Sequence, residues 1–121
     1  MAKILVVDDS ALSRRISRGI LQGAGHMVIE AEDGISGIES YFLEKPDLVL
    51  LDITMKGMNG IEVLQKLREM DANAKIVIAT ADIQSSTRTL TQSGGACGFV
   101  VKPLGADQVL AAVNAALQGV A

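Results

Sequence analysis

Two adjacent aspartates, Asp8 and Asp9, stand directly after the apolar stretch KILVV of residues 3–7. An apolar run without alternation is typical of a strand covered on both faces, so the two carboxylates come where the chain leaves a sheet. Like charges at such short separation repel each other and disfavour folding. A hard divalent cation would remove that repulsion, because Mg2+ is bound in proteins by carboxylate oxygens. The pair is therefore a candidate for magnesium binding.

Further reactive side chains follow other apolar runs. Asp52 follows LVLL, Thr80 follows KIVIA, and Lys102 follows FVV. In an open parallel sheet, ligands bind outside the carboxyl ends of the strands. Parallel strands all point the same way, so we expect these side chains to meet Asp8 and Asp9 at one edge of the sheet, although tens of residues separate them in sequence.

This set of side chains suits phosphoryl transfer. Mg2+ held among Asp8, Asp9 and Asp52 would draw an anionic phosphoryl donor towards an anionic nucleophile. Asp52 could then attack phosphorus and form an aspartyl phosphate, while the ammonium of Lys102 stabilises charge on the transferring oxygens. The alternative for Asp8 and Asp9 is a pair of solvated loop acids. The presence of Asp52 and Lys102 at the same edge favours the metal site.

The chain that must position these residues alternates apolar runs with amphipathic stretches. Apolar residues at a spacing of three or four, such as Leu12, Ile16 and Ile20, predict helices with one buried face. The buried faces of the later helices are predicted as Ile35, Ile38 and Phe42; Ile61, Leu64, Leu67 and Met70; and Val109, Leu110, Val113 and Leu117. Strands are predicted at 3–7, 27–31, 48–51, 75–79 and 99–101, and helices at 11–21, 33–44, 60–70, 83–96 and about 107–117.

Strands that alternate with helices over brief connections imply βαβ units, right-handed crossovers and a parallel sheet. We predict an α/β protein: one doubly wound (βα)5 domain over residues 1–121, with helices on both faces and no output domain. The segment 83–96 fits less well, since its six Ser and Thr residues are mediocre helix formers. It is either a marginal surface helix or an element held loosely because it must move.

Composition narrows the function further. The chain has 11 Lys and Arg against 14 Asp and Glu, a formal net charge of −3 without a basic cluster, which argues against nucleic-acid binding. The single cysteine, Cys97, excludes an internal disulfide. Neither a signal peptide nor an apolar run of bilayer-spanning length is evident, so we expect a cytoplasmic protein without membrane insertion. Aromatic residues make up 2%, so the core must be aliphatic.

Four segments resemble the receiver domains of two-component response regulators, and the single-domain chemotaxis regulators of the CheY type in particular: ILVVDDS, PDLVLLDITMKGMNGIEVL, IVIATA and GFVVKP. They occur in the family's order and spacing. The resemblance implies a flavodoxin-like fold with strand order 2-1-3-4-5. It also implies that Asp52 is the phosphoacceptor and that Asp8 and Asp9 belong to the Mg2+ site, with Asp9 as a direct ligand. Thr54 would lend a backbone carbonyl to the metal.

By the same resemblance Thr80 is the switch hydroxyl, Phe99 the switch aromatic, and Lys102 the phosphate-binding lysine, with a cis peptide bond to Pro103. A phosphoryl group adds charge and strong acceptor oxygens. Thr80 would follow these oxygens inward and Phe99 would fill the vacated space, which would bias the neighbouring fourth helix. Taken alone, Thr80 reads as a strand-end hydroxyl and Phe99 as a core residue. Lys56 departs from the family, which usually has proline there.

The resemblance predicts a stand-alone response regulator: a signalling switch and not a turnover enzyme, limited to its own phosphorylation and dephosphorylation. Expected partners of this monomer are a sensor histidine kinase, a phosphatase and a downstream protein such as the flagellar motor switch. The target would dock on the face made by the fourth helix, fifth strand and last helix. Two alternatives stay open. One is a phosphorelay intermediate that passes the group from Asp52 to another protein's histidine. The other, an aspartate-nucleophile phosphatase of the haloacid dehalogenase type, is disfavoured because position 54 is Thr where a second acid is needed.

Overall fold

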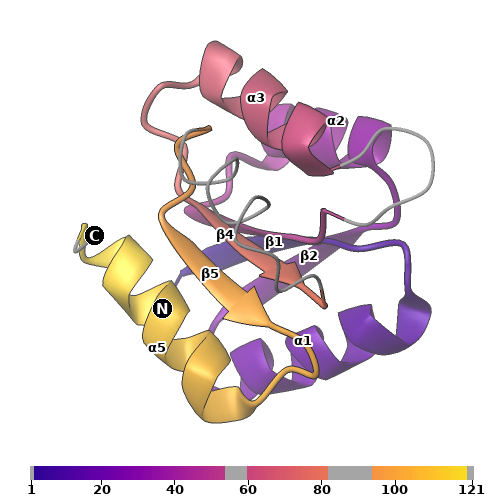
Figure 1. Ribbon diagram of the computed structural model, residues 1–121, viewed down its shortest axis with the longest axis vertical. Coiled ribbons are helices and arrows are strands. Elements are labelled where there is room, and N and C mark those ends of the chain that lie inside the picture. Colours follow the sequence, from indigo (N-terminus) through magenta and orange to yellow (C-terminus); the bar gives the residue numbers. More distant parts are fainter. Residues whose placement is uncertain (1, 54–59, 82–93, 120–121) are drawn as a thin grey trace.

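The computed structural model describes residues 2–53, 60–81 and 94–119. Within these ranges five strands form one parallel sheet in the order β2-β1-β3-β4-β5, and four helices pack on it (Figure 1). The strands are β1 (Lys3–Val7), β2 (Met27–Ala31), β3 (Leu48–Leu51), β4 (Ile76–Thr80) and β5 (Gly98–Val101). The helices are α1 (Ala11–Gly23), α2 (Gly34–Glu44), α3 (Gly60–Met70) and α5 (Ala106–Leu117). The predicted α/β fold and strand order are confirmed.

The sheet separates two hydrophobic cores. Figure 1 shows α2 and α3 on one side of the sheet and α1 and α5 on the other. Successive side chains of a strand point to opposite faces, so Leu5 and Val7 of β1 pack in the core under α2 and α3, whereas Ile4 and Val6 pack in the core under α1 and α5. Burial on both faces explains why the inner strands are apolar without alternation.

The strands β1, β2 and β3 and the helix α3 have the predicted boundaries, and the boundaries of the other described elements shift by one or two residues. The fourth strand ends at Thr80, so this threonine is its last residue, and α1 continues to Gly23. The predicted helix at 83–96 falls almost wholly on residues outside the described ranges and stays a prediction. The longest described helix has 13 residues, and none of the described helices combines the length and apolar character needed to cross a bilayer.

The predicted buried face of α1 is wrong at two of its three positions, whereas Ile20 packs, partly buried, against the core under α1 and α5. Leu12 is 65% exposed and Ile16 is also exposed, whereas Ser17 and Leu21 are buried. Each residue turns the helix by roughly 100°, so the observed face lies about one position away from the predicted stripe. The small Ser17 and the larger Leu21 therefore face the sheet, and Leu12 and Ile16 lie towards solvent.

The predicted face of α2 is also wrong at two of its three positions, for a related reason, whereas Ile38 packs, partly buried, against the core under α2 and α3. Ile35 and Phe42 are exposed, and the buried positions are Gly34 and Gly37. A Cβ added at Gly37 would lie 3.0 Å from both methyl groups of Val7 in β1. The absence of a side chain there allows close packing of α2 on the sheet. The stripes of α3 and α5 are largely confirmed, because Leu64, Leu67, Val109 and Val113 are buried, although Met70 is partly exposed.

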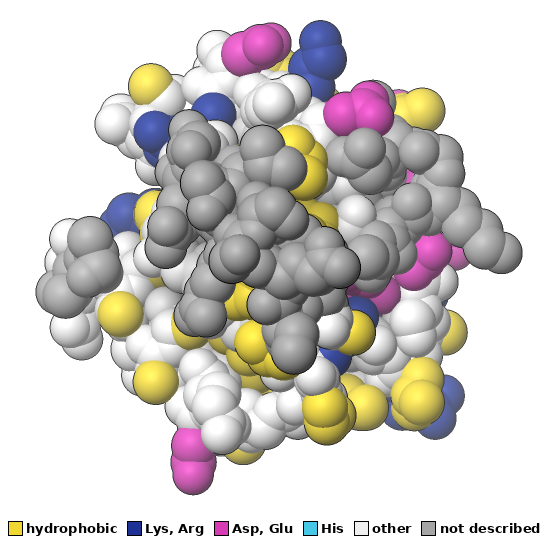
Figure 2. Space-filling model, in the orientation of Figure 1, with side chains coloured by type: hydrophobic (Ala, Val, Ile, Leu, Met, Phe, Trp, Pro, Cys, Tyr) yellow, Lys and Arg dark blue, Asp and Glu magenta, His cyan; other side chains and the backbone are white. Residues whose placement is uncertain are grey.

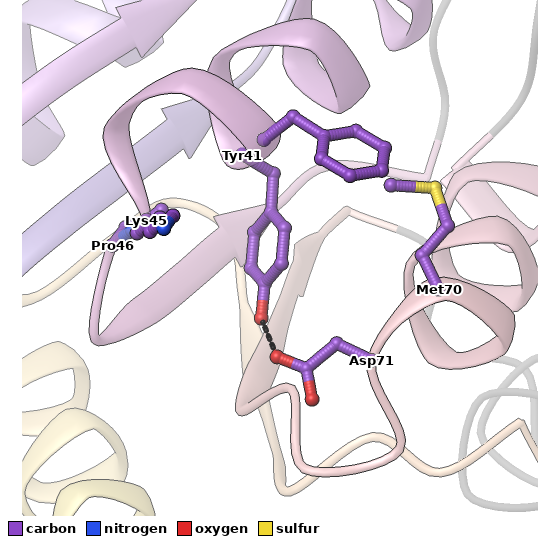
Figure 3. Close-up of a pocket in the computed structure, with 6 residues that line it drawn as sticks. Tyr41, Lys45, Pro46, Met70 and Asp71 are labelled. Carbon is purple, nitrogen blue, oxygen red and sulfur yellow. Dashed lines mark hydrogen bonds between the residues drawn. The ribbon is translucent and has the colours of Figure 1, made fainter.

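A hollow of about 310 Å³ lies between the carboxyl ends of α2 and α3, at the amino edge of the sheet (Figure 3). Tyr41, Phe42, Lys45, Pro46, Met70 and Asp71 line it. The Tyr41 hydroxyl donates a hydrogen bond to Asp71 Oδ2 at 2.7 Å, which ties the two helices together. Burial, this hydrogen bond and the charge of Asp71 raise the pKa of Tyr41 to about 12. The same bond lowers the pKa of Asp71.

We expect the ultraviolet titration of tyrosinate to show this shift directly, because Tyr41 is the single tyrosine and the chain has no tryptophan. The midpoint should lie near pH 12. Asp71→Asn should move it towards the ordinary value of 10.0, because the substitution removes the charge and the carboxylate acceptor. A raised pKa in the folded state means that this contribution to stability is complete below pH 10 and is lost as pH rises through about 12. Equal midpoints for both proteins, with circular dichroism confirming that each is folded, would contradict the assignment.

Candidate functional site

The register of β1 and β3 sets two aspartates side by side. Val7 pairs with Leu51 at the ends of these strands, and the N–H of Asp52 donates to the carbonyl of Val7 at 2.9 Å. Asp8 directly follows β1 and Asp52 directly follows β3, and each of these aspartates is only 3% exposed. Asp9 follows and is exposed. One carboxylate oxygen from each of the three aspartates lies within 4.8 Å of the others, so the predicted convergence at the carboxyl edge is confirmed.

Lys102 reaches this cluster from the end of β5. Its Nζ lies 2.8 Å from Asp8 Oδ2 and 3.3 Å from Asp52 Oδ2, and it donates to Ser13 Oγ at 3.3 Å. The peptide bond between Lys102 and Pro103 is cis, as the resemblance implies. Burial is the largest single influence on the ammonium and lowers its pKa. The hydrogen bond to Asp8 and the charges of Asp52 and Asp8 together outweigh it, so the pKa of Lys102 is raised. The side chain is therefore a cation at neutral pH.

The first turn of α1 completes the surroundings of Asp8. Ser10 caps this helix, since its Oγ accepts from the N–H of Ser13 at 3.2 Å. The N–H of Ser10 donates to Asp8 Oδ1 at 2.9 Å, so both oxygens of Asp8 have partners. Sequence reasoning missed these two serines as part of the site. The signal for Ser10 is its place between the acids and a helix start, where serine is a favoured cap; Ser13 carries no such signal.

The donor set fits a hard divalent cation. Three carboxylates against one ammonium leave two formal negative charges at this edge. Oxygen donors of this kind are the ligands that Mg2+ prefers, so Asp8, Asp9 and Asp52 are the residues that would hold it. Thr54, the predicted carbonyl ligand, lies outside the described residues, and its role stays a prediction. Figure 2 shows acidic side chains gathered on the right of the view, the side on which α1 begins in Figure 1.

Thr80 and Phe99 lie on the neighbouring strands β4 and β5. Thr80 is fully buried, and its carbonyl accepts from the N–H of Lys102 at 2.8 Å. Phe99 pairs with Ile78 in the β-ladder and packs, partly buried, against the core under α2 and α3. The main chain of Thr80 is thus joined directly to the lysine of the site. The switch roles of Thr80 and Phe99 stay predictions.

Gly60, the first residue of α3, lies against the backbone of Asp52 and Ile53. Its N–H donates to the carbonyl of Ile53 at 3.1 Å. A Cβ at this position would overlap the Cα of Ile53 and would lie 2.5 Å from the carbonyl oxygen of Asp52. Glycine is therefore required for α3 to begin against the backbone that carries Asp52.

Comparison with known proteins decides the family. The response regulator receiver domain matches residues 4–114 of the chain. The chain belongs to this family. Receiver domains bind Mg2+ at an acidic pocket, and the cluster of Asp8, Asp9 and Asp52 is able to hold a metal ion. Proteins of this family interact with histidine kinases and with downstream proteins.

Individual relatives cover nearly the whole receiver domain. Chemotaxis protein CheY of Bacillus subtilis (strain 168) is 42% identical over 116 residues, which are 95% of this chain and 97% of the relative. Protein PilH of Pseudomonas aeruginosa is 35% identical over 121 residues, which are 98% of this chain and 100% of the relative. Both relatives are therefore similar in length to this chain.

Solved structures show the same fold. A two-component response regulator of the LuxR family from Aurantimonas sp. SI85-9A1 superposes with a TM-score of 0.94 at 31% identity, covering 99% of this chain and 87% of that chain. Chemotaxis protein CheY4 of Vibrio cholerae superposes with a TM-score of 0.89 at 28% identity, covering 94% and 97%.

Removing the ammonium should destabilise the carboxyl edge. We expect Lys102→Met to lower the free energy of unfolding by about 3–5 kcal/mol at neutral pH, because it leaves two buried carboxylates without their cation. Mg2+ should restore part of the loss. The control is Lys3→Met, which breaks an exposed pair with Glu44 and should cost at most about 1 kcal/mol. Urea denaturation with and without Mg2+ measures both. Equal losses for the two variants would show that Lys102 does not neutralise the acids.

Adding one methyl group at the start of α3 should disturb the Asp52 segment. We expect Gly60→Ala to lower the free energy of unfolding by about 1–3 kcal/mol, since the new Cβ must displace backbone atoms. Gly19→Ala is the matched control, because a Cβ at Gly19 meets nothing within 4 Å and should stabilise α1 by up to about 1 kcal/mol. Urea denaturation compares them. A Gly60→Ala variant as stable as wild type would refute the close approach.

Proposed function

We propose that this receiver domain is a response regulator in which Asp52 accepts a phosphoryl group from a partner histidine kinase in an Mg2+-dependent reaction. The observation that carries the proposal is the meeting of three carboxylates within 4.8 Å, with Lys102 paired to Asp8 and Asp52. This combination of a nucleophile, cation ligands and a fixed ammonium is the set that phosphoryl transfer to a carboxylate needs.

In the proposed reaction an Asp52 carboxylate oxygen forms a bond to phosphorus. The bond between phosphorus and the imidazole nitrogen of the kinase phosphohistidine breaks, and its electron pair stays on that nitrogen. The Lys102 ammonium, 3.3 Å from Asp52 Oδ2, is placed to bind the oxygens of the arriving group. Its raised pKa keeps it charged throughout the neutral range, so it donates to those oxygens without first gaining a proton.

Asp8 and Asp9 have different parts in this proposal. Asp8 is buried and held by Ser10 and Lys102, so it fixes the shape of the acidic pocket. Asp9 is exposed, so it is accessible to a hydrated cation, and the resemblance to the family implies that it is the direct ligand. The bound Mg2+ would supply positive charge to the transferring phosphoryl oxygens. The main-chain carbonyl of Thr54 completes the predicted ligands.

Phosphorylation would change the conformation of the domain through Thr80 and Phe99. The added phosphoryl group brings about −1.5 to −2 charges and three acceptor oxygens, which would attract the Thr80 hydroxyl. Thr80 is joined through its carbonyl to Lys102, and Phe99 lies one strand away with its ring only partly buried. Phe99 would move into the space that Thr80 leaves. The face made by the predicted fourth helix, β5 and α5 would then bind the downstream protein.

The relatives indicate the pathway. CheY of B. subtilis is a chemotaxis protein by its name, and with it and PilH as relatives we assign this chain to chemotaxis or another form of motility. The flagellar motor switch is the proposed target, and a phosphatase the proposed antagonist. We propose a cytoplasmic monomer that acts as a switch and not as a turnover enzyme.

Asp52→Asn should abolish labelling by acetyl phosphate in the presence of Mg2+, because an amide cannot act as the nucleophile. The matched control is Asp47→Asn, which makes the same change at an exposed aspartate that accepts from the N–H of Lys3. Intact mass spectrometry measures the phosphoryl adduct. Labelling of the Asp52→Asn protein at the wild-type level, or no labelling of wild type with or without Mg2+, would contradict the proposal.

The same labelled protein separates the remaining alternatives. A relay intermediate would hand the phosphoryl group to a histidine phosphotransfer domain, whereas a switch would lose it only by hydrolysis. Rapid multiple turnover of small phosphate esters would instead identify a phosphatase.

A further inference from the structure

Arg14 connects α1 to the tip of β1 and to β2. Its Nη1 donates to the main-chain carbonyl of Asp8 at 2.6 Å, and its Nε lies 3.5 Å from Glu30 Oε1 on β2. The Arg14 side chain is only 16% exposed. One guanidinium therefore links the residue that begins the acidic cluster to the neighbouring strand.

The other polar groups of Asp8 already have partners. Its N–H donates to the carbonyl of Ala31 at 3.1 Å, and its two side-chain oxygens accept from Ser10 and Lys102. Arg14 supplies the partner of the carbonyl. This contact is a charge-assisted hydrogen bond, a class stronger than bonds between neutral groups.

The carbonyl of Asp8 belongs to the peptide bond that leads into Asp9. A peptide unit is planar, so fixing its oxygen also fixes the N–H and the Cα of Asp9. Asp9 is exposed and lies on a loop between β1 and α1, where the sheet itself does not fix the backbone. The orientation of this one peptide plane therefore decides where the Asp9 carboxylate lies relative to Asp8 and Asp52.

The chain offers a neighbour with which Arg14 can be compared. Arg18 follows one helical turn later, and its Nη1 lies 2.8 Å from Glu30 Oε2. Both arginines thus pair with the same carboxylate of β2. They differ in the second contact, since it is Arg14 that donates to the Asp8 carbonyl.

We propose that Arg14 is a positioning residue for the cation site: its guanidinium holds the peptide plane between Asp8 and Asp9 so that Asp9 faces the other two carboxylates. The inference rests on the proposed function, in which these acids bind Mg2+. Arg14 itself does not touch the phosphoryl group. The rigid planar fork of arginine suits the role because it serves the carbonyl and Glu30 at once.

The test compares Arg14→Met with Arg18→Met by isothermal titration with Mg2+ at fixed ionic strength. Each substitution removes one positive charge from α1, and loss of positive charge near an acidic site should by itself strengthen cation binding. We expect Arg14→Met to weaken Mg2+ binding on the order of tenfold, the scale of an outer contact that orients a ligand. Arg18→Met should leave the affinity unchanged or raise it. The two variants therefore differ in the sign of the effect.

A second readout separates positioning from chemistry. The rate of labelling by acetyl phosphate should reach the wild-type value in Arg14→Met at saturating Mg2+, with the half-saturating concentration raised by the same factor as the dissociation constant. Arg14→Lys keeps the charge and one donor group, so it should bind Mg2+ more weakly than wild type and more tightly than Arg14→Met. If Arg14→Met does not fold, the Mg2+ affinity of Arg14→Lys relative to wild type tests the positioning role of Arg14.

Three outcomes would overturn the inference. Mg2+ affinity of Arg14→Met equal to or above that of wild type would do so, as would equal weakening in Arg14→Met and Arg18→Met. So would wild-type affinity in Arg14→Lys when Arg14→Met is unfolded. Any of these would leave the proposed function intact if wild type still binds Mg2+ and is labelled at Asp52. Absence of Mg2+ binding by wild type would overturn both.

Discussion

The ion pairing of Lys102 with Asp8 and Asp52 is the interaction on which the carboxyl edge of this receiver domain depends. Asp8 and Asp52 are each 3% exposed. Burying two carboxylates without a cation would strongly destabilise the fold, because an unpaired charge costs far more free energy in the interior than in water. The three residues directly follow three different strands, β5, β1 and β3, so the charges meet only when the sheet has formed. One ammonium does not balance three acids, and the remaining negative charge leaves the edge able to hold a divalent cation.

The fold holds these groups through the backbone as much as through side chains. The register of Val7 with Leu51 places the two buried aspartates in line. Gly60 lets α3 begin directly against the segment after Asp52, and Arg14 binds the carbonyl of Asp8. Acids attached to main chain fixed in this way cannot move apart to relieve their repulsion. That constraint is what allows a small domain to keep a site ready for its cation.

Much of this arrangement follows from the sequence. Strands buried on both faces leave apolar runs that are easy to recognise, and parallel strands necessarily bring residues such as Asp8 and Asp52 to one edge. The orientation of α1 and α2 did not fully follow, because periodicity identifies a stripe while small residues such as Ser17 and Gly37 are the ones buried against the sheet. The contact of Arg14 with a main-chain carbonyl could not be predicted either. Every residue has such a carbonyl, so the sequence does not indicate which one a side chain will contact. The pairing of Tyr41 with Asp71 depends on packing between residues 30 positions apart.

The position of Lys102 at the end of β5 has a thermodynamic consequence. This strand pairs with β4 alone in the described sheet, and the N–H of Lys102 donates to the carbonyl of Thr80, the last residue of β4. Any fraying of this outer strand withdraws the ammonium from the acids, so strand pairing and charge neutralisation are linked equilibria. A bound cation that neutralises the acids in place of Lys102 lowers the free energy needed to separate β5 from β4. A bound anion that pairs with the Lys102 ammonium raises that free energy. The ladder between β4 and β5, at one edge of the sheet, thus responds to whatever occupies the acidic edge.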